Sequence, residues 1–108
     1  MKTGIELIAE ERQRQIDVEG WTIGHDVQEH PNNELANAAA TYAMDSDCRE
    51  ALMDIYDCRL VGVPATWPWD VEWYKPTPDN RIKELIKAGA LIAAEIDRLQ
   101  MIQKNSDK

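Results

Sequence analysis

The chain has 108 residues, with 20 acidic and 12 basic side chains and a formal net charge of −8. A field of this sign repels phosphate backbones, and the basic residues form no concentrated patch, so we expect no direct nucleic-acid binding. The length allows one domain, and no apolar run approaches the roughly 18 residues that a membrane span needs, so we expect a soluble protein without membrane contact.

The first helix is predicted over residues 4–18. Ile5, Ile8 and Ile16 recur at helical spacing and form one narrow apolar stripe. Thr3, followed by Glu6 three residues later, is the capping-box pattern that starts a helix. This helix should therefore lay one face against the rest of the domain.

A polar loop is predicted over residues 21–31, and it holds both histidines of the chain. His25, Asp26 and His30 offer the side chains that transition metals prefer. Two histidines in one loop, without a further ligand motif, favour a plainer role. We expect His25 and Asp26 to bond loop backbone and His30 to cap the next helix, so no metal site is predicted here.

The second helix is predicted over residues 32–44, because its apolar residues follow the i, i+3, i+4, i+7 pattern. These residues are Leu35, Ala38, Ala39, Tyr42 and Ala43. A third helix is predicted over residues 47–58. Cys48 and Cys58 would lie about 15 Å apart along it, beyond disulfide reach, which favours a reducing compartment such as the cytoplasm.

Residues 64–77 predict an extended loop, because prolines recur through them. Trp67, Trp69 and Trp73 lie in this segment, and tryptophan combines a large apolar area with one N–H group. Their rings could fold back onto helix faces that carry alanine, where the small side chains leave room for a large ring. They could instead stack a planar base, with Lys75 and Arg81 meeting its phosphates. We expect a mixture, with some rings anchored and one exposed.

The last helix is predicted over residues 78–103, with Thr77 as its cap and Pro78 in its first turn. Its apolar stripe should face the core. The stripe consists of Ile82, Leu85, Ile86, Gly89, Ile92, Ala93, Ile96 and Leu99. We expect Glu95 of this helix to pair with Arg12, which falls within the apolar stripe of the first helix and needs a carboxylate partner.

These elements predict an all-α fold of three to four helices forming one domain, residues 1–103, with a disordered tail at 104–108. The long C-terminal helix should pack on the first two helices, and the tryptophan-rich loop should lie across one side.

Four carboxylates could converge if the first, second and last helices pack together. They are Glu11, Asp26, Glu34 and Glu95. Clustered carboxylates hold Mg²⁺ and a triphosphate in small helical pyrophosphohydrolases of the MazG type, which the chain resembles in part. That resemblance implies Mg²⁺-dependent catalysis by Glu11, Glu34 and Glu95. The sequence departs from the family's motif at Arg14 and Arg98, where the motif has carboxylates.

Segments of distinctive composition extend over the whole chain. They are Ile8–Gln15, Glu19–Thr22, His25-Asp26, Glu34–Ala36 with Ala38-Ala39, Trp67–Trp69 and Lys87–Ile96. In these segments the chain resembles a family of small uncharacterised proteins carried by phages and prophages. The resemblance implies an accessory role inside the bacterial host, such as blocking host defence or host takeover.

We expect a non-enzymatic phage accessory protein, without a cofactor, that binds a host protein or sequesters a small nucleotide. Self-association is compatible with the sequence. The expected binding residues are Trp21, His25, Tyr42, Trp67, Trp69, Trp73, Lys75 and Arg81. The alternatives are the MazG-type enzyme and an acidic decoy that occupies a nucleic-acid-binding host protein.

Overall fold

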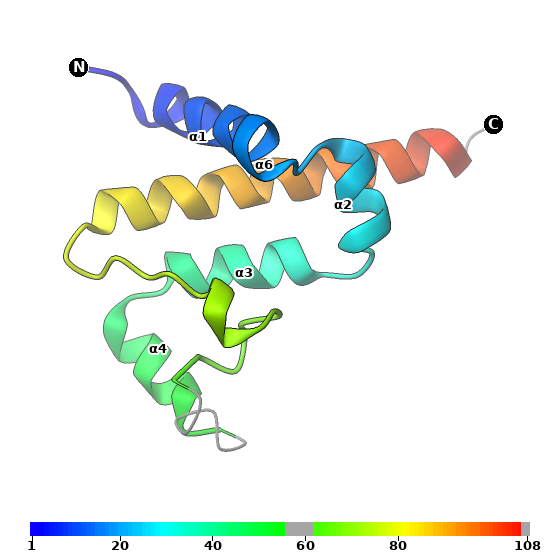
Figure 1. Ribbon diagram of the computed structural model, residues 1–108. Helices are drawn as coiled ribbons and strands as arrows, with labels where there is room; N and C mark the ends of the chain where they lie inside the picture. The colour runs from blue at the N-terminus through cyan, green and yellow to red at the C-terminus, as the bar shows by residue number, and fades with distance from the viewer. Residues whose placement is uncertain (56–61, 107–108) are drawn as a thin grey trace.

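The computed structural model describes residues 1–55 and 62–106, and these form helices and loops without a strand. The elements are α1 (Gly4–Glu19), α2 (Ile23–Glu29), α3 (Glu34–Ala43), α4 (Ser46–Met53), the 3-10 helix η1 (Val71–Trp73) and α6 (Arg81–Ser106). The prediction of an all-α fold is confirmed. Helix α6 runs through the middle of the molecule, with α1 on one side and α3 on the other, and α2 runs past α6 from the end of α1 towards the start of α3 (Figure 1).

Helix α1 begins with the predicted capping box, in which Thr3 and Glu6 bond each other's backbone N–H groups. It ends at Gly20, whose φ of 73° is the left-handed conformation that glycine adopts most easily. The chain then turns into α2, where a polar loop was expected. That expectation is wrong because the hydroxyl of Thr22 caps the backbone N–H of His25 and starts a new helix of seven residues.

Helix α3 buries the face that its sequence pattern predicts, including Leu35, Ala38 and Tyr42. Helix α4 begins one residue before the predicted start, because the carboxylate of Asp45 accepts the backbone N–H of Cys48 at 2.8 Å. It ends at Met53. The predicted continuation to residue 58, with Cys58, lies outside the described residues beyond position 55.

Helix α6 begins three residues later than predicted. Residues 77–80 form a turn closed by the backbone bond from Asn80 to Thr77, at 2.8 Å. The side chain of Asn80 then accepts the backbone N–H of Lys83 at 3.2 Å and so acts as the cap. The helix extends to Ser106, so residues 104–106 are helical where a disordered tail was expected.

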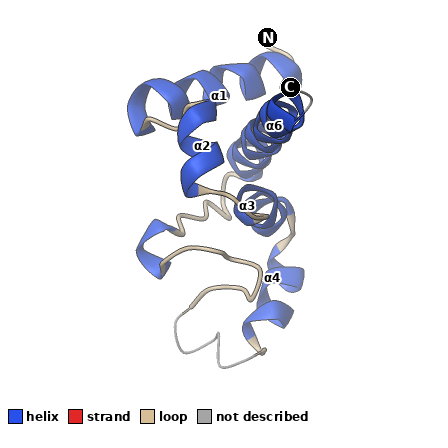
Figure 2. Ribbon diagram, turned by 90° about the vertical axis from the view of Figure 1, so that its right-hand side faces the viewer, coloured by secondary structure: helices blue, strands red, loops and turns tan. Residues whose placement is uncertain are grey.

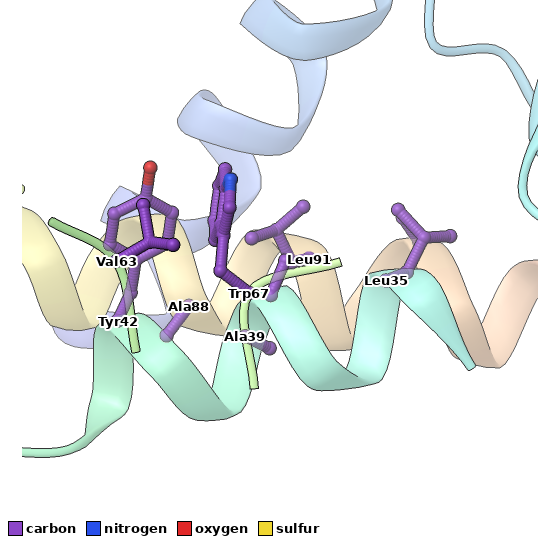
Figure 3. Packing of buried hydrophobic residues seen from close by; sticks show 9 residues of the cluster. Leu35, Ala39, Tyr42, Val63, Trp67, Ala88 and Leu91 are labelled. Atoms are coloured by element: carbon purple, nitrogen blue, oxygen red, sulfur yellow. The ribbon is translucent and has the colours of Figure 1, made fainter. Parts of the chain in front are cut away.

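The core lies between α3 and α6 and is completed by the segment that follows residue 62 (Figure 3). Its members are Leu35, Ala38, Ala39, Tyr42, Val63, Trp67, Ala88, Leu91 and Ala94. Because most of the α6 members are alanines, the two helices approach closely, and Tyr42 and Trp67 fill the space beside them.

The face of α6 that was predicted to be buried is the exposed one. Ile82, Ile92 and Ile96 have exposed fractions of 69%, 48% and 50%, and Leu85 and Leu99 are similar. The opposite face packs on α3 and also buries Glu84, Glu95 and Arg98. Apolar residues surround much of α6, so contacts with other elements, not periodicity, select the buried face.

The predicted ion pair between Arg12 and Glu95 is also wrong. Glu95 is held by Arg98 of its own helix, with N–O distances of 2.6 and 3.0 Å. Arg12 lies instead beside Asp26, at 3.5 Å, and donates a bond to the carbonyl of Trp21 at 2.9 Å. The cause is α2, which brings Asp26 beside Arg12, while the carboxylate that the last helix supplies is Asp97, at 3.9 Å, and not Glu95.

Within residues 1–55 and 62–106, no helix is both long and apolar enough to cross a lipid bilayer.

Candidate functional site

A pocket of about 850 Å³ opens where α1, α2, α3 and α6 meet the tryptophan-rich segment. In Figure 2 this segment and α2 lie on the same side of α3 and α6. The pocket brings together seven of the eight residues expected to bind a ligand. They are Trp21, His25, Tyr42, Trp67, Trp69, Trp73 and Lys75.

Arg81, the eighth residue, does not line this pocket. Its guanidinium donates to the carbonyls of Tyr42, Ala43 and Met44 at the end of α3. Carbonyls at a helix C-terminus lack partners within the helix and attract cations, so Arg81 caps α3. The expectation that Arg81 meets a phosphate is therefore not supported by its placement.

The aromatic wall of the pocket is a continuous series of ring contacts, tilted between Trp21 and Trp69 and edge-to-face at Trp67. Trp69 lies between Trp21 and Trp67, with ring centroids 5.4 Å from each, and Trp67 in turn contacts Tyr42 at 5.4 Å. Such edge-to-face pairs are favoured by the ring quadrupoles. Trp67 also donates its indole N–H to the carbonyl of Asp70 at 3.1 Å, which fixes the loop that carries it.

The tryptophans differ in exposure, as the sequence leads one to expect. Trp67 belongs to the core, with an exposed fraction of 9%, whereas Trp73 is 60% exposed at the rim. Trp73 ends the 3-10 turn η1, which interrupts the predicted extended loop. An exposed indole beside a pocket remains free to stack on a ligand, while the buried rings shape the wall.

Lysines supply positive charge at one side of the pocket. The ammonium of Lys87 lies 4.7 Å from the ring centroid of Tyr42 and donates to the carbonyl of Lys75 at 3.2 Å. Burial lowers the pKa of Lys87, because it disfavours the charged form. Arg14 also lines the pocket, but Glu11 binds its guanidinium with two bonds of 2.6 and 2.9 Å.

Gln15 and Lys87 are pocket residues that the sequence analysis missed. Gln15 is only 2% exposed, and its side-chain oxygen has no hydrogen-bond partner within the protein. Gln15 stands among other polar side chains of α1, and Lys87 is a single lysine in an apolar stretch of α6, so no local pattern marks either as a pocket residue. Their place in the pocket depends on how α1 crosses α6.

The histidines and Asp26 do not have the roles expected of them. The carboxylate of Asp26 is fully buried and lies 2.9 Å from Nδ1 of His30. Residues 26 and 30 are four positions apart and therefore share one side of the chain at α2. The ring of His30 packs between Trp21 and Trp69, with centroid distances of 5.3 and 5.0 Å. The two histidines line the pocket.

The carboxylates proposed for Mg²⁺ do not converge. Glu11 is engaged by Arg14, Glu95 by Arg98, and Glu34 accepts the backbone N–H of Asn32 at 2.9 Å. Among the described residues, the only group of three or more His, Cys, Asp or Glu donors close enough to share a metal is His25, Asp26 and His30. The prediction of a four-carboxylate site is therefore wrong, because arginines bind two of the four carboxylates.

Comparisons of the chain with protein-family models, with curated proteins and with solved structures give no match.

Proposed function

We propose that this protein binds a planar, anionic small molecule of the nucleotide class in the aromatic pocket, without catalysis. The observation that carries the proposal is the composition of that pocket, in which four tryptophans and Tyr42 face the same space as Lys75 and Lys87. Ligand sites of this kind commonly enclose about 300–1,000 Å³, and the pocket of about 850 Å³ falls in that range.

The exposed indole of Trp73 is suited to stack on a base. Stacking of a base on an aromatic side chain contributes about 1–3 kcal/mol, whatever the base. Lys75 has an exposed side chain, and the partly desolvated ammonium of Lys87 would regain a full charge partner on meeting a phosphate. The two lysines lie beside the aromatic wall, since Lys87 stacks on Tyr42 and bonds the carbonyl of Lys75, so a ring and its phosphate would be bound next to each other.

Acidic residues at the same pocket limit the ligand to a small one. Glu11, Glu19, Glu29 and Asp70 line it together with the lysines, and the whole chain carries a net charge of −8. A polynucleotide would meet this charge along its length, whereas a mononucleotide, dinucleotide or cyclic nucleotide would not. The acidic-decoy alternative rests on net charge alone and has no further support.

On the resemblance to phage and prophage proteins, we place this binding in a counter-defence or host-takeover role. A binder that removes a nucleotide signal from solution needs affinity and no turnover. A Mg²⁺-dependent pyrophosphohydrolase is the alternative, and it lacks support because Glu11 and Glu95 are held by arginines.

We further propose that the partner of the exposed α6 stripe is a second copy of this chain. The exposed apolar residues of α6 recur at spacings of three, four and seven residues; they are Ile82, Leu85, Ile92, Ile96 and Leu99. This is the heptad spacing with which helices pack along one another. A single copy leaves these side chains in water while burying charged ones, an arrangement that a self-complementary interface would explain.

The test of the proposed function is a titration with linear and cyclic nucleotides that follows thermal stability and tryptophan fluorescence together. One ligand should raise the melting temperature and quench fluorescence, because binding to the folded state alone stabilises it. The same wells, supplied with Mg²⁺, should release no pyrophosphate. Pyrophosphate release would favour the enzyme instead.

Single substitutions test whether the ligand binds in the aromatic pocket. Trp73→Ala and Lys75→Ala should each weaken the affinity, by about tenfold for the loss of one stacked ring. Lys83→Ala is the matched control, since Lys83 is an exposed lysine of α6 that does not line the pocket. Equal affinity in all three variants would contradict the proposed site. If none of the linear or cyclic nucleotides binds to the wild type, the proposed ligand class is contradicted.

A further inference from the structure

Helix α2 and the C-cap residue that follows it bring two imidazoles and one carboxylate close together. One donor atom from each of His25, Asp26 and His30 lies within 4.8 Å of the other two. The Oδ1 atom of Asp26 is 2.9 Å from Nδ1 of His30 and 3.5 Å from Nδ1 of His25. Ligands at about 2.05 Å in tetrahedral geometry stand about 3.3 Å apart, so these spacings bracket the value that a bound metal ion requires.

The hydrogen bonds within the protein leave this cluster incomplete. Nδ1 of His25 is a buried atom that has no hydrogen-bond partner within the protein, and Oδ2 of Asp26 has only an ion-pair contact, with Nη2 of Arg12 at 3.5 Å. Asp26 has no exposed surface at all. Buried polar atoms are nearly always paired, and an ionised carboxylate that is only partly paired is costly. A buried imidazole nitrogen without a partner, within 4.8 Å of a buried carboxylate oxygen and a second imidazole nitrogen, is what a cation site presents.

We propose that His25, Asp26 and His30 bind one divalent transition-metal ion on the wall of the aromatic pocket. Imidazole nitrogen selects ions such as Zn²⁺, Ni²⁺ and Co²⁺ over Mg²⁺ or Ca²⁺, which prefer oxygen ligands. Three protein ligands leave at least one coordination position open. Because His25 and His30 line the pocket, the open position would face it.

Arg12 acts as an outer group of this site. Its Nη2 lies 3.5 Å from Oδ2 of Asp26, while its Nη1 is fixed by the carbonyl of Trp21 at 2.9 Å. A guanidinium in this place limits the rotation of the carboxylate, as groups behind metal ligands generally do. The rings of Trp21 and Trp69 pack on His30 and hold its imidazole in position.

The metal proposal goes beyond the binding function and stands without it. If the proposed function also holds, a metal ion here would add positive charge to a pocket whose acidic residues otherwise offset its lysines, and its open position could accept an anionic oxygen of the ligand. That coupling rests on the proposed function, whereas metal binding itself does not.

The experiment uses the full chain, freed of metal with a chelator and titrated with Co²⁺ in the absence of any nucleotide. We expect one equivalent of Co²⁺ per chain, visible absorption typical of imidazole and carboxylate ligands, and displacement of Co²⁺ by Zn²⁺. His25→Gln should weaken Co²⁺ affinity by at least about tenfold. His25 is partly exposed, so this variant should keep the fold, which circular dichroism will check.

Asp26→Asn provides the second ligand test, and Asp17→Asn, an exposed carboxylate of α1, is its control for the loss of one charge. Affinity should fall in the first and stay unchanged in the second. Absence of Co²⁺ binding, or binding that His25→Gln leaves unchanged, would overturn the proposal. Co²⁺ binding without any nucleotide binding would overturn only the proposed function, so the two failures are distinguishable.

Discussion

Glu84 is a carboxylate that the fold removes from water and surrounds with donors. It is 1% exposed, and Arg49 binds its two oxygens at 2.7 and 2.8 Å. The backbone N–H of Thr77 and the guanidinium of Arg81 add bonds of 3.0 and 3.2 Å. Arg49 is the main cause of the lowered pKa of Glu84. This pair joins α4 to the start of α6 and fixes which face of α6 is buried.

Replacing the carboxylate of Glu84 should lower the free energy of unfolding at neutral pH. Glu84→Gln leaves Arg49 buried without its counter-charge, and breaking such a pair costs about 3–5 kcal/mol. Urea unfolding at pH 7 should show the loss, with Glu72→Gln, an exposed carboxylate of η1, as the control. Equal stability of Glu84→Gln and wild type would contradict this role.

The same variant predicts a pH dependence. Because the pKa of Glu84 is lower in the folded state, its contribution is present above the unfolded-state pKa and is lost as the pH falls through the folded-state pKa. Below about pH 4.3, the usual glutamate pKa, the free energies of unfolding of wild type and Glu84→Gln should therefore approach each other. A difference that stays constant down to pH 2 would show that ionisation of Glu84 is not the source of the stabilisation.

At the scale of elements, α1 crosses α6 at Gly89. A Cβ atom built at Gly89 would lie 2.5 Å from Cδ1 and 2.8 Å from Cγ1 of Ile8, closer than packed atoms approach. Gly89→Leu should destabilise the protein by about 1–3 kcal/mol through overpacking. Adding Ile8→Ala should restore part of that loss, and thermal unfolding of the two single variants and the double variant measures the coupling. Additive effects would contradict the contact.

The sequence predicted the elements whose signals are local. The capping box at Thr3 and the helical spacing around Leu35 and Tyr42 correspond to α1 and α3. Helix α2 was not predicted, because seven residues are too few to show a helical repeat of apolar residues. Its only sequence signal was the capping residue Thr22. The buried face of α6 could not be predicted, since it is selected by α3 and by Arg49, which are distant in sequence.

The candidate site was predictable in the same uneven way. A concentration of tryptophans between prolines marked the aromatic wall, because few other segments could supply such rings. Lys87 and Gln15 reach the pocket only through the packing of α1 and α6, which no spacing rule describes. Asp26 was assigned to backbone contacts because the helix that places it beside Arg12 was not expected.

At the scale of the whole molecule, the exposed stripe of α6 predicts self-association. Ile96→Asp places a charge in the middle of the proposed interface and should yield monomers, while wild type should have twice the monomer mass by light scattering after gel filtration. Val71→Asp is the control, since Val71 is equally exposed, at 50%, but lies in η1. A monomeric wild type would contradict the proposed interface.

The most direct test of the central claim, that the aromatic pocket is the ligand site, is an NMR titration of ¹⁵N-labelled protein with the nucleotide that stabilises it most. The indole N–H signals of the four tryptophans and the amides of pocket residues such as Lys75 and Lys87 should shift together, while those of α4 stay in place. Shifts confined to the exposed α6 stripe, or unchanged indole signals at a saturating ligand concentration, would contradict the account.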